Sequence, residues 1–155
     1  MRSTCGGSRR RPGRSSPDRA RRPDRTADLS AALDALGRRP HTQIALPGGP
    51  VELSGHAVRE IAAAVAACLD NIDTHVGPDA PAWVLLLDLG DEVEVTVRDE
   101  GPGIPAGRLE EAASSGRLGV SSSIRGRIAD LGGTAELVTA PAQGTEWELT
   151  LPRAT

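Results

Sequence analysis

The residues from Asp99 to Ile104 carry the strongest chemical signal in this sequence. An acid is followed at close spacing by Gly101 and Gly103, at the end of an alternating segment that predicts a strand over 93–98. Glycine lets the backbone approach a ligand where a Cβ atom would collide. A carboxylate before such a turn can accept a hydrogen bond from an amino group, such as the exocyclic amine of adenine. Because acid-Gly-Pro-Gly is also ordinary turn chemistry, other parts of the chain must supply the partners.

A second candidate group lies at the end of a predicted helix over 56–76. Asn71 and His75 are four residues apart and share a helical face with Ala67. The carbonyl oxygen of an asparagine suits Mg²⁺, which takes one or two protein ligands beside nucleotide phosphates. The alternative is that Asn71 only caps a fraying helix end.

Two further segments could contact a phosphorylated ligand. The Gly116–Ser123 run leads into a predicted helix over 124–131, and the free N–H groups at a helix start favour anions. The alternative is a Gly/Ser linker. Gly144 and Thr145 open the last predicted strand, where the threonine hydroxyl could hydrogen-bond near a bound base.

The elements that must position these residues alternate between helical and strand patterns. The order predicts an α+β fold, a two-layer sandwich with helices on one face of a mixed, mostly antiparallel sheet. The predicted helices cover 27–36, 56–76 (capped by Ser54) and 124–131, and the predicted strands cover 43–46, 82–89, 93–98, 135–139 and 145–151, with a polar segment over 105–118.

Charge divides the chain into two parts. Residues 1–39 carry eleven arginines against four aspartates, a balance of +7, whereas the remainder has a balance of −10. We expect 1–26 to be a disordered Arg/Pro/Ser-rich tail and 27–155 to be one folded domain. No apolar run follows the arginines, as a signal peptide requires, and no run is long enough to span a membrane. No aromatic residues interleave with the arginines, so we expect no direct contact with nucleic acid. Cys5 and Cys68 have no metal-ligand spacing, which favours a reduced, cytoplasmic protein.

Taken together, the four candidate groups resemble the ATP-binding domain of sensor histidine kinases, the GHKL or Bergerat superfamily. Their order and spacing agree over about 27–152. Asn71 matches the N-box, Asp99, Gly101 and Gly103 match the G1 box, Gly116 and Gly119 match the G2 box, and Gly144-Thr145 matches the closing GT element. Leu69–Asn71, Trp83–Leu86 and Ser123–Thr134 look closer still to the C-terminal domain of MacS-type actinobacterial sensor kinases.

The resemblance implies a Bergerat fold that binds ATP and Mg²⁺ and transfers the γ-phosphoryl group to a histidine. Asp99 would hold the adenine amine, Asn71 would coordinate Mg²⁺, and His75 would lie near the phosphates. The remaining residues of the implied site would flank the base or cradle phosphates with their backbone: Gly101, Gly103, Ile104, Gly116, Gly119, Val120, Ser121, Gly144 and Thr145. The implied partner is a histidine phosphoacceptor domain or a response regulator.

Two features depart from the family pattern. Many N-boxes carry a glutamate base four residues before the asparagine, where this chain has Ala67, and Asp70 lies about 100° away around the helix. Neither His41 nor His56 lies in a setting typical of a phosphoacceptor. We therefore expect a kinase domain that is truncated or acts in trans. The alternatives are a nucleotide-binding regulatory module without transfer activity, an anti-sigma-factor-like serine kinase, and a scaffold whose glycines are only turns.

Overall fold

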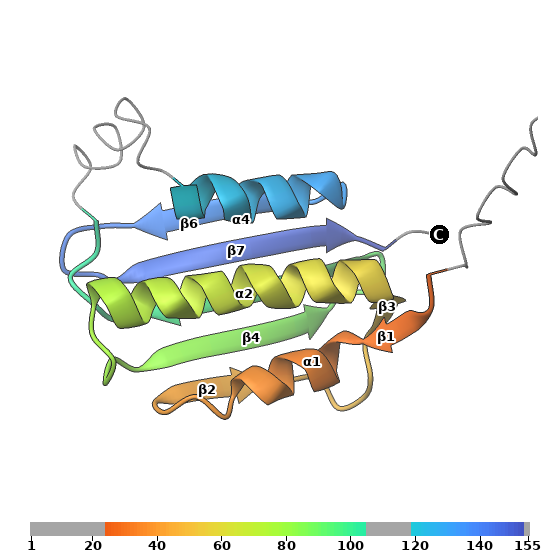
Figure 1. Cartoon of the computed structure of the whole chain (residues 1–155), viewed down its shortest axis with the longest axis horizontal. Coiled ribbons are helices and arrows are strands. Elements are labelled where there is room, and N and C mark those ends of the chain that lie inside the picture. The colour runs from red at the N-terminus through yellow and green to blue at the C-terminus, as the bar shows by residue number, and fades with distance from the viewer. Residues whose placement is uncertain (1–23, 105–118, 154–155) are drawn as a thin grey trace, which may run out of the picture.

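The structure, a computed structural model, describes residues 24–104 and 119–153 (Figure 1). Most of the expected tail, the polar segment over 105–118 and the candidate Gly116 lie outside these residues. The helices are α1 (Leu29–Leu36), α2 (Gly55–His75) and α4 (Gly119–Asp130), and the strands are β1 (Thr26–Asp28), β2 (Thr42–Ala45), β3 (Glu52–Ser54), β4 (Ala82–Asp88), β5 (Glu92–Asp99), β6 (Thr134–Thr139) and β7 (Thr145–Pro152).

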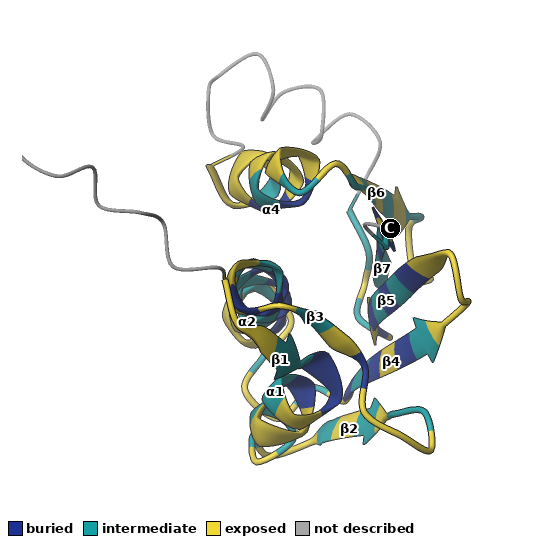
Figure 2. Cartoon of the chain, turned by 90° about the vertical axis from the view of Figure 1, so that its right-hand side faces the viewer, coloured by how far each residue is buried: buried dark blue, intermediate teal, exposed yellow. Residues whose placement is uncertain are grey.

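The main sheet has five strands in the order β2-β4-β5-β7-β6. The pair β2·β4 is parallel, and the other neighbours are antiparallel. Figure 2 shows the three helices in one layer, on one face of this sheet. The predicted α+β sandwich with helices on one face of a mixed sheet is therefore confirmed.

Alternation and helical periodicity explain which side chains form the core between the two layers. In β5, Val93, Val95 and Val97 are buried, and the residues between them face the other side of the sheet. The buried face of α2 repeats at helical spacing and comprises Val58, Ile61, Ala64, Val65, Cys68, Leu69 and Ile72. Trp147 of β7 is 4% exposed, and the Arg125 guanidinium of α4 lies over its ring.

Two helix starts differ from the sequence prediction. The first helix begins at Leu29 and not at 27, because Thr26–Asp28 pair with β3 and Asp28 caps the helix. Strands of three residues are too short to show an alternating pattern, so β1 and β3 were not predicted. The helix α4 begins at Gly119 and not at 124, so most of the expected Gly/Ser approach is already helical.

The start of α2 is fixed by residues that precede it in the chain. The Ser54 hydroxyl accepts a hydrogen bond from the Ala57 N–H group at 3.1 Å, which confirms the predicted cap. A carboxylate oxygen of Asp24 accepts from the His56 N–H group at 2.7 Å, and the Arg25 carbonyl accepts from the Gly55 N–H group at 2.7 Å. Three of the N–H groups that a helix start leaves without intrahelical partners therefore have acceptors.

Candidate functional site

Asp99 lies at the end of the central strand β5, on the side of the sheet that faces the helices. It alternates with the buried valines of that strand and is itself only 3% exposed. Its cross-strand neighbour on β7 is Thr145, and the neighbour of Thr145 on β6 is Thr139. Adjacent strands lie about 4.8 Å apart, so the three polar side chains form a row at one end of the sheet. The structure thus brings together Asp99 and Thr145, which are 46 positions apart in the sequence.

The turn after β5 is packed against the turn between β6 and β7. Gly103 has a φ angle of +71°, and a Cβ atom there would overlap the carbonyl oxygen of Ala140. Gly144 has a φ angle of +75°, and its Cβ atom would overlap the carbonyl oxygen of Asp99. The Ala142 N–H group donates to the Pro102 carbonyl at 2.7 Å. Both glycines are therefore required by the contact between two backbone turns.

Gly101 lies in the same turn, next to the residue that ends α2. A Cβ atom there would lie 2.7 Å from Cγ2 of Val76, the residue that ends α2. The Gly101 N–H group donates to Oδ1 of Asp99 at 2.8 Å, so the turn also fixes the carboxylate. The sequence predicted that Gly101 and Gly103 let the backbone approach a ligand closely. The structure adds that Gly103 and Gly144 are required by packing between backbone segments, whereas the atoms nearest to Gly101 belong to the side chains of Val76 and Asp99.

Thr139 joins the two turns and was not among the predicted site residues. Its hydroxyl oxygen accepts from the Ile104 N–H group at 2.8 Å and donates to the Gly144 carbonyl at 3.0 Å. It also lies 3.4 Å from the hydroxyl of Thr145. The available signal was the alternation of β6, which places residue 139 on the same side of the sheet as Leu137 and Ala135.

Asn71 lies on the side of α2 that faces α4. Glu60 of α2 is bonded to Arg127 of α4 at 2.7 Å, which identifies that side. Asn71 is eleven residues after Glu60, and at 3.6 residues per turn the two share nearly one face, as does Ala67. Figure 1 shows that α4 begins at the end of the molecule where α2 ends. Half-buried Asn71 and the first turn of α4 (Gly119, Val120 and Ser121) are therefore at the same end of the helix layer.

Asp70, one residue before Asn71, points to a different part of the molecule. Its carboxylate binds the Arg39 guanidinium at 2.7 Å, and Asp73 lies 3.7 Å from the same group. Arg39 belongs to the connection between α1 and β2, away from α4. Asp70 is therefore paired with Arg39 on a side of α2 about 100° around the helix from Asn71. His75 is exposed in the last turn of the helix.

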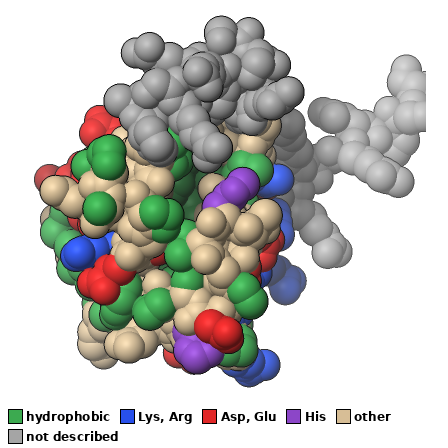
Figure 3. Space-filling view, turned by 90° about the vertical axis from the view of Figure 1, so that its left-hand side faces the viewer, with side chains coloured by type: hydrophobic (Ala, Val, Ile, Leu, Met, Phe, Trp, Pro, Cys, Tyr) green, Lys and Arg blue, Asp and Glu red, His purple; other side chains and the backbone are tan. Residues whose placement is uncertain are grey.

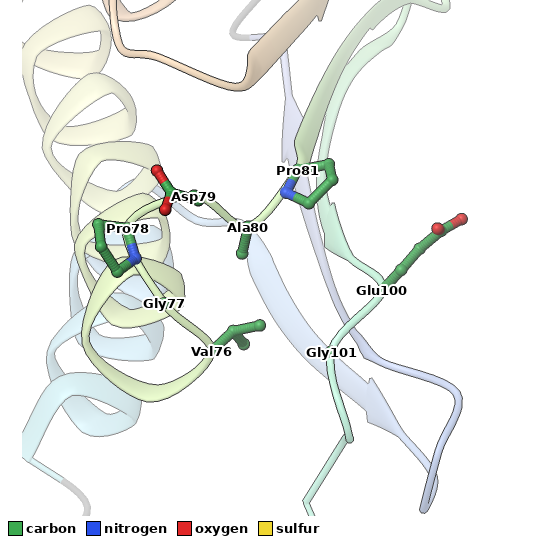
Figure 4. Close-up of a pocket in the computed structure, with 8 residues that line it drawn as sticks. All are labelled: Val76, Gly77, Pro78, Asp79, Ala80, Pro81, Glu100 and Gly101. Carbon is green, nitrogen blue, oxygen red and sulfur yellow. The ribbon is translucent and has the colours of Figure 1, made fainter.

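A pocket of about 390 Å³ borders this end of the molecule. Figure 4 shows Val76 and Ala80 directed into the space between the end of α2 and Gly101, whereas Glu100 points away. In the space-filling view of this end, apolar side chains are interspersed with polar surface and with exposed histidine (Figure 3). The pocket contains Gly101 but not Asp99, so we do not assign it to the predicted nucleotide site. Its lining residues are Val76, Gly77, Pro78, Asp79, Ala80, Pro81, Glu100 and Gly101.

Neither a metal cluster nor a membrane-spanning helix is found in the described part of the chain. No three histidine, cysteine or acidic side chains come together there as ligands. Within 24–104 and 119–153, every helix is too short or too polar to cross a bilayer.

Comparison with solved structures shows the same fold in several histidine kinases. Histidine kinase AdeS of Acinetobacter baumannii matches with a TM-score of 0.66 at 16% identity, covering 84% of this chain and 68% of that one. The histidine kinase domain of the E. coli osmosensor EnvZ matches with a TM-score of 0.65 at 20% identity, covering 89% and 94%. The ATP-binding domain of PrrB from Mycobacterium tuberculosis matches with a TM-score of 0.62 at 23% identity, covering 86% and 100%.

Sequence comparison gives the family directly. No curated protein matches the chain. The family described as histidine kinase-, DNA gyrase B-, and HSP90-like ATPase matches residues 56–155, which include α2, the turn after β5, α4 and the last two strands. Because that match covers well over half of the sequence, the chain belongs to this GHKL family of ATPase domains.

Proposed function

We propose that this chain binds ATP with Mg²⁺ and that Asp99 recognises the adenine amine. The observation that carries the proposal is the position of the Asp99 carboxylate, which is buried at the end of β5. Oδ1 accepts from the Gly101 N–H group, and Oδ2 receives no hydrogen bond from the described residues. An exocyclic amine is a hydrogen-bond donor that would pair with this oxygen.

The phosphates would extend from the row formed by Asp99, Thr145 and Thr139 toward the end of α2 and the start of α4. Asn71 is on the α4 side of α2, and its carbonyl oxygen would be the protein ligand of Mg²⁺. One amide ligand is enough, because Mg²⁺ usually completes its octahedron with phosphate oxygens and waters. When bound, the ion would neutralise charge on the phosphates. The first N–H groups of α4, at Gly119, Val120 and Ser121, would bind phosphate oxygens, and exposed His75 would lie near the phosphate tail.

The reaction that we propose is transfer of the γ-phosphoryl group to a histidine of a partner domain, with a response regulator as the next acceptor. Family membership and the fold shared with histidine kinases support this proposal. Little covalent chemistry is required of the chain itself, because positioning and electrostatics dominate phosphoryl transfer. The closer resemblance to MacS-type kinases, action in trans and a cytoplasmic location stay predictions.

The second candidate is a nucleotide-binding module without transfer activity. This candidate is favoured by the absence of a base beside Asn71. Ala67 lies on the same face of α2, at the position where many N-boxes carry a glutamate base. Asp70 does not replace that base, because it is bonded to Arg39 on another side of the helix. An anti-sigma-factor-like serine kinase stays an alternative with a different acceptor.

Calorimetry with ATP and Mg²⁺ tests the binding step. We expect Asp99→Asn to weaken binding at least tenfold, because the amide replaces an acceptor with a donor facing the adenine amine. The matched control is Glu100→Gln, which neutralises the next, exposed acid and should leave affinity within twofold of the original. Binding by Asp99→Asn as tight as by the original chain would exclude this role of Asp99.

Labelled ATP then separates the two candidate functions. The chain is incubated with isolated histidine phosphoacceptor domains, with serine-containing anti-anti-sigma-type proteins and alone. Label on a histidine supports the kinase, and label on a serine supports the alternative acceptor. Binding without label on any partner supports the regulatory module.

A further inference from the structure

We infer that Thr139 is a positioning residue of the nucleotide site and that its hydroxyl fixes the turn that presents Asp99. This inference rests on the proposed function. One hydrogen bond holds each end of the turn from Asp99 to Ile104. At its start the Gly101 N–H group donates to the Asp99 carboxylate, and at its end the Ile104 N–H group donates to Thr139.

The hydroxyl of Thr139 serves both turns at once. It accepts from Ile104 at 2.8 Å and donates to the Gly144 carbonyl at 3.0 Å, so its proton and a lone pair are both used. No other described side chain bonds to the backbone of residues 100–104 from outside that turn. The hydroxyl is therefore the side-chain link between the end of β6 and the backbone beside Asp99.

The contact between the turns makes this link effective. Gly103 and Gly144 bring the two backbones so close that no Cβ atom fits between them, and Ala142 donates to Pro102 across the same contact. A shift of the turn at Ile104 would therefore also move Gly103 and, through it, the carboxylate of Asp99. Small displacements in a binding site are costly, because recognition of the amine depends on the position of one oxygen atom.

The test is substitution of Thr139 with measurement of nucleotide affinity and base preference. Thr139→Val keeps the shape of the side chain and removes both hydrogen bonds. We expect ATP–Mg²⁺ to bind about tenfold more weakly and the preference for ATP over inosine triphosphate to fall, since inosine lacks the amine. Thr139→Ser keeps the hydroxyl and should restore both values. Thr134→Val, at the exposed start of the same strand, is the matched control and should change neither value.

The possible outcomes distinguish failure of the proposed function from failure of the inference about Thr139. If the original chain binds no ATP, the proposed function fails and the inference fails with it. If the original chain binds ATP and Thr139→Val binds within twofold of it with unchanged base preference, the inference alone is wrong. If Thr139→Val does not fold, amide exchange in the original chain gives the answer. ATP should slow exchange of the Ile104 N–H group, and an unchanged rate would contradict the inference.

Discussion

Replacement of Gly144 by alanine tests the contact between the two turns directly. The residue has a φ angle of +75°, and an alanine in the left-handed region costs about 1–2 kcal/mol. The new Cβ atom would also overlap the Asp99 carbonyl oxygen and lie 3.0 Å from Cα of Glu100, so the turns must separate. Separation breaks the bonds from Ala142 to Pro102 and from Ile104 to Thr139, each worth about 1 kcal/mol.

The expected loss of unfolding free energy for Gly144→Ala is therefore about 3–4 kcal/mol. Gly90 provides the matched control, because its φ angle is +87° and a Cβ atom there has no neighbour within 4 Å. Gly90→Ala should lose only the conformational part, about 1–2 kcal/mol. The difference of about 2 kcal/mol isolates the contact between the turns and is large against the total stability of a domain, about 5–15 kcal/mol.

Urea unfolding at equilibrium measures both variants. The slope of free energy against urea should stay unchanged, and the midpoint of Gly144→Ala should fall about 1 M below that of Gly90→Ala. Equal midpoints for the two variants would show that the left-handed backbone alone explains Gly144. In that case the packing between the two turns contributes nothing to stability, and our account of the glycines is refuted.

Two further predictions concern single buried or capping groups. Burial raises the pKa of the Cys68 thiol from 9.0 to about 12. The stabilisation that comes from burying the neutral thiol is therefore present below pH 9 and is lost as the pH rises toward 12, because the thiol of the unfolded chain ionises first. Urea unfolding at several pH values measures this effect. Above pH 9, the unfolding free energy of the original chain should fall by about 1.4 kcal/mol per pH unit relative to that of Cys68→Ala. A difference between the two chains that does not vary with pH would contradict this. The chain contains no lysine and no tyrosine, which otherwise titrate in the same range. Asp28→Ala removes the acceptor for the N–H groups of Ser30 and Val51 and should lower the unfolding free energy by about 2 kcal/mol, whereas Asp34→Ala, an exposed acid in the same helix, should be nearly neutral. Thermal unfolding compares the two, and equal melting temperatures would exclude the capping role of Asp28.

The main sheet was predictable because most of its strands are long enough to show an alternation of apolar and polar residues. The valines of β5 and the apolar run of β4 indicated a hairpin, and its register pairs Trp83 with Arg98. The same reasoning failed for β1 and β3, since three residues show no period. It also placed the start of α4 too late, because Ile124 and Ile128 are its only buried side chains.

Candidate site residues could be selected from the sequence where a single residue carries the relevant functional group. Asp99, Asn71 and Thr145 were selected for their functional groups and their spacing. Thr139 could not be found in this way, because its importance comes from two backbone groups in other segments. The packing requirement for the glycines could not be predicted either, since only the folded chain shows that Gly103 and Gly144 each face the backbone of the other turn.

The anchoring of α2 at its start has a consequence for the limits of the cooperative folding unit. The family match begins at residue 56, yet Asp24, Arg25 and Ser54 supply the acceptors for the first turn of that helix. Leu29 and Leu33 are fully buried members of the same core. A chain cut at residue 56 would expose that part of the core and leave the helix start without its acceptors. We therefore expect the unit that unfolds cooperatively to extend back to about residue 24, which lies before the residues that match the family.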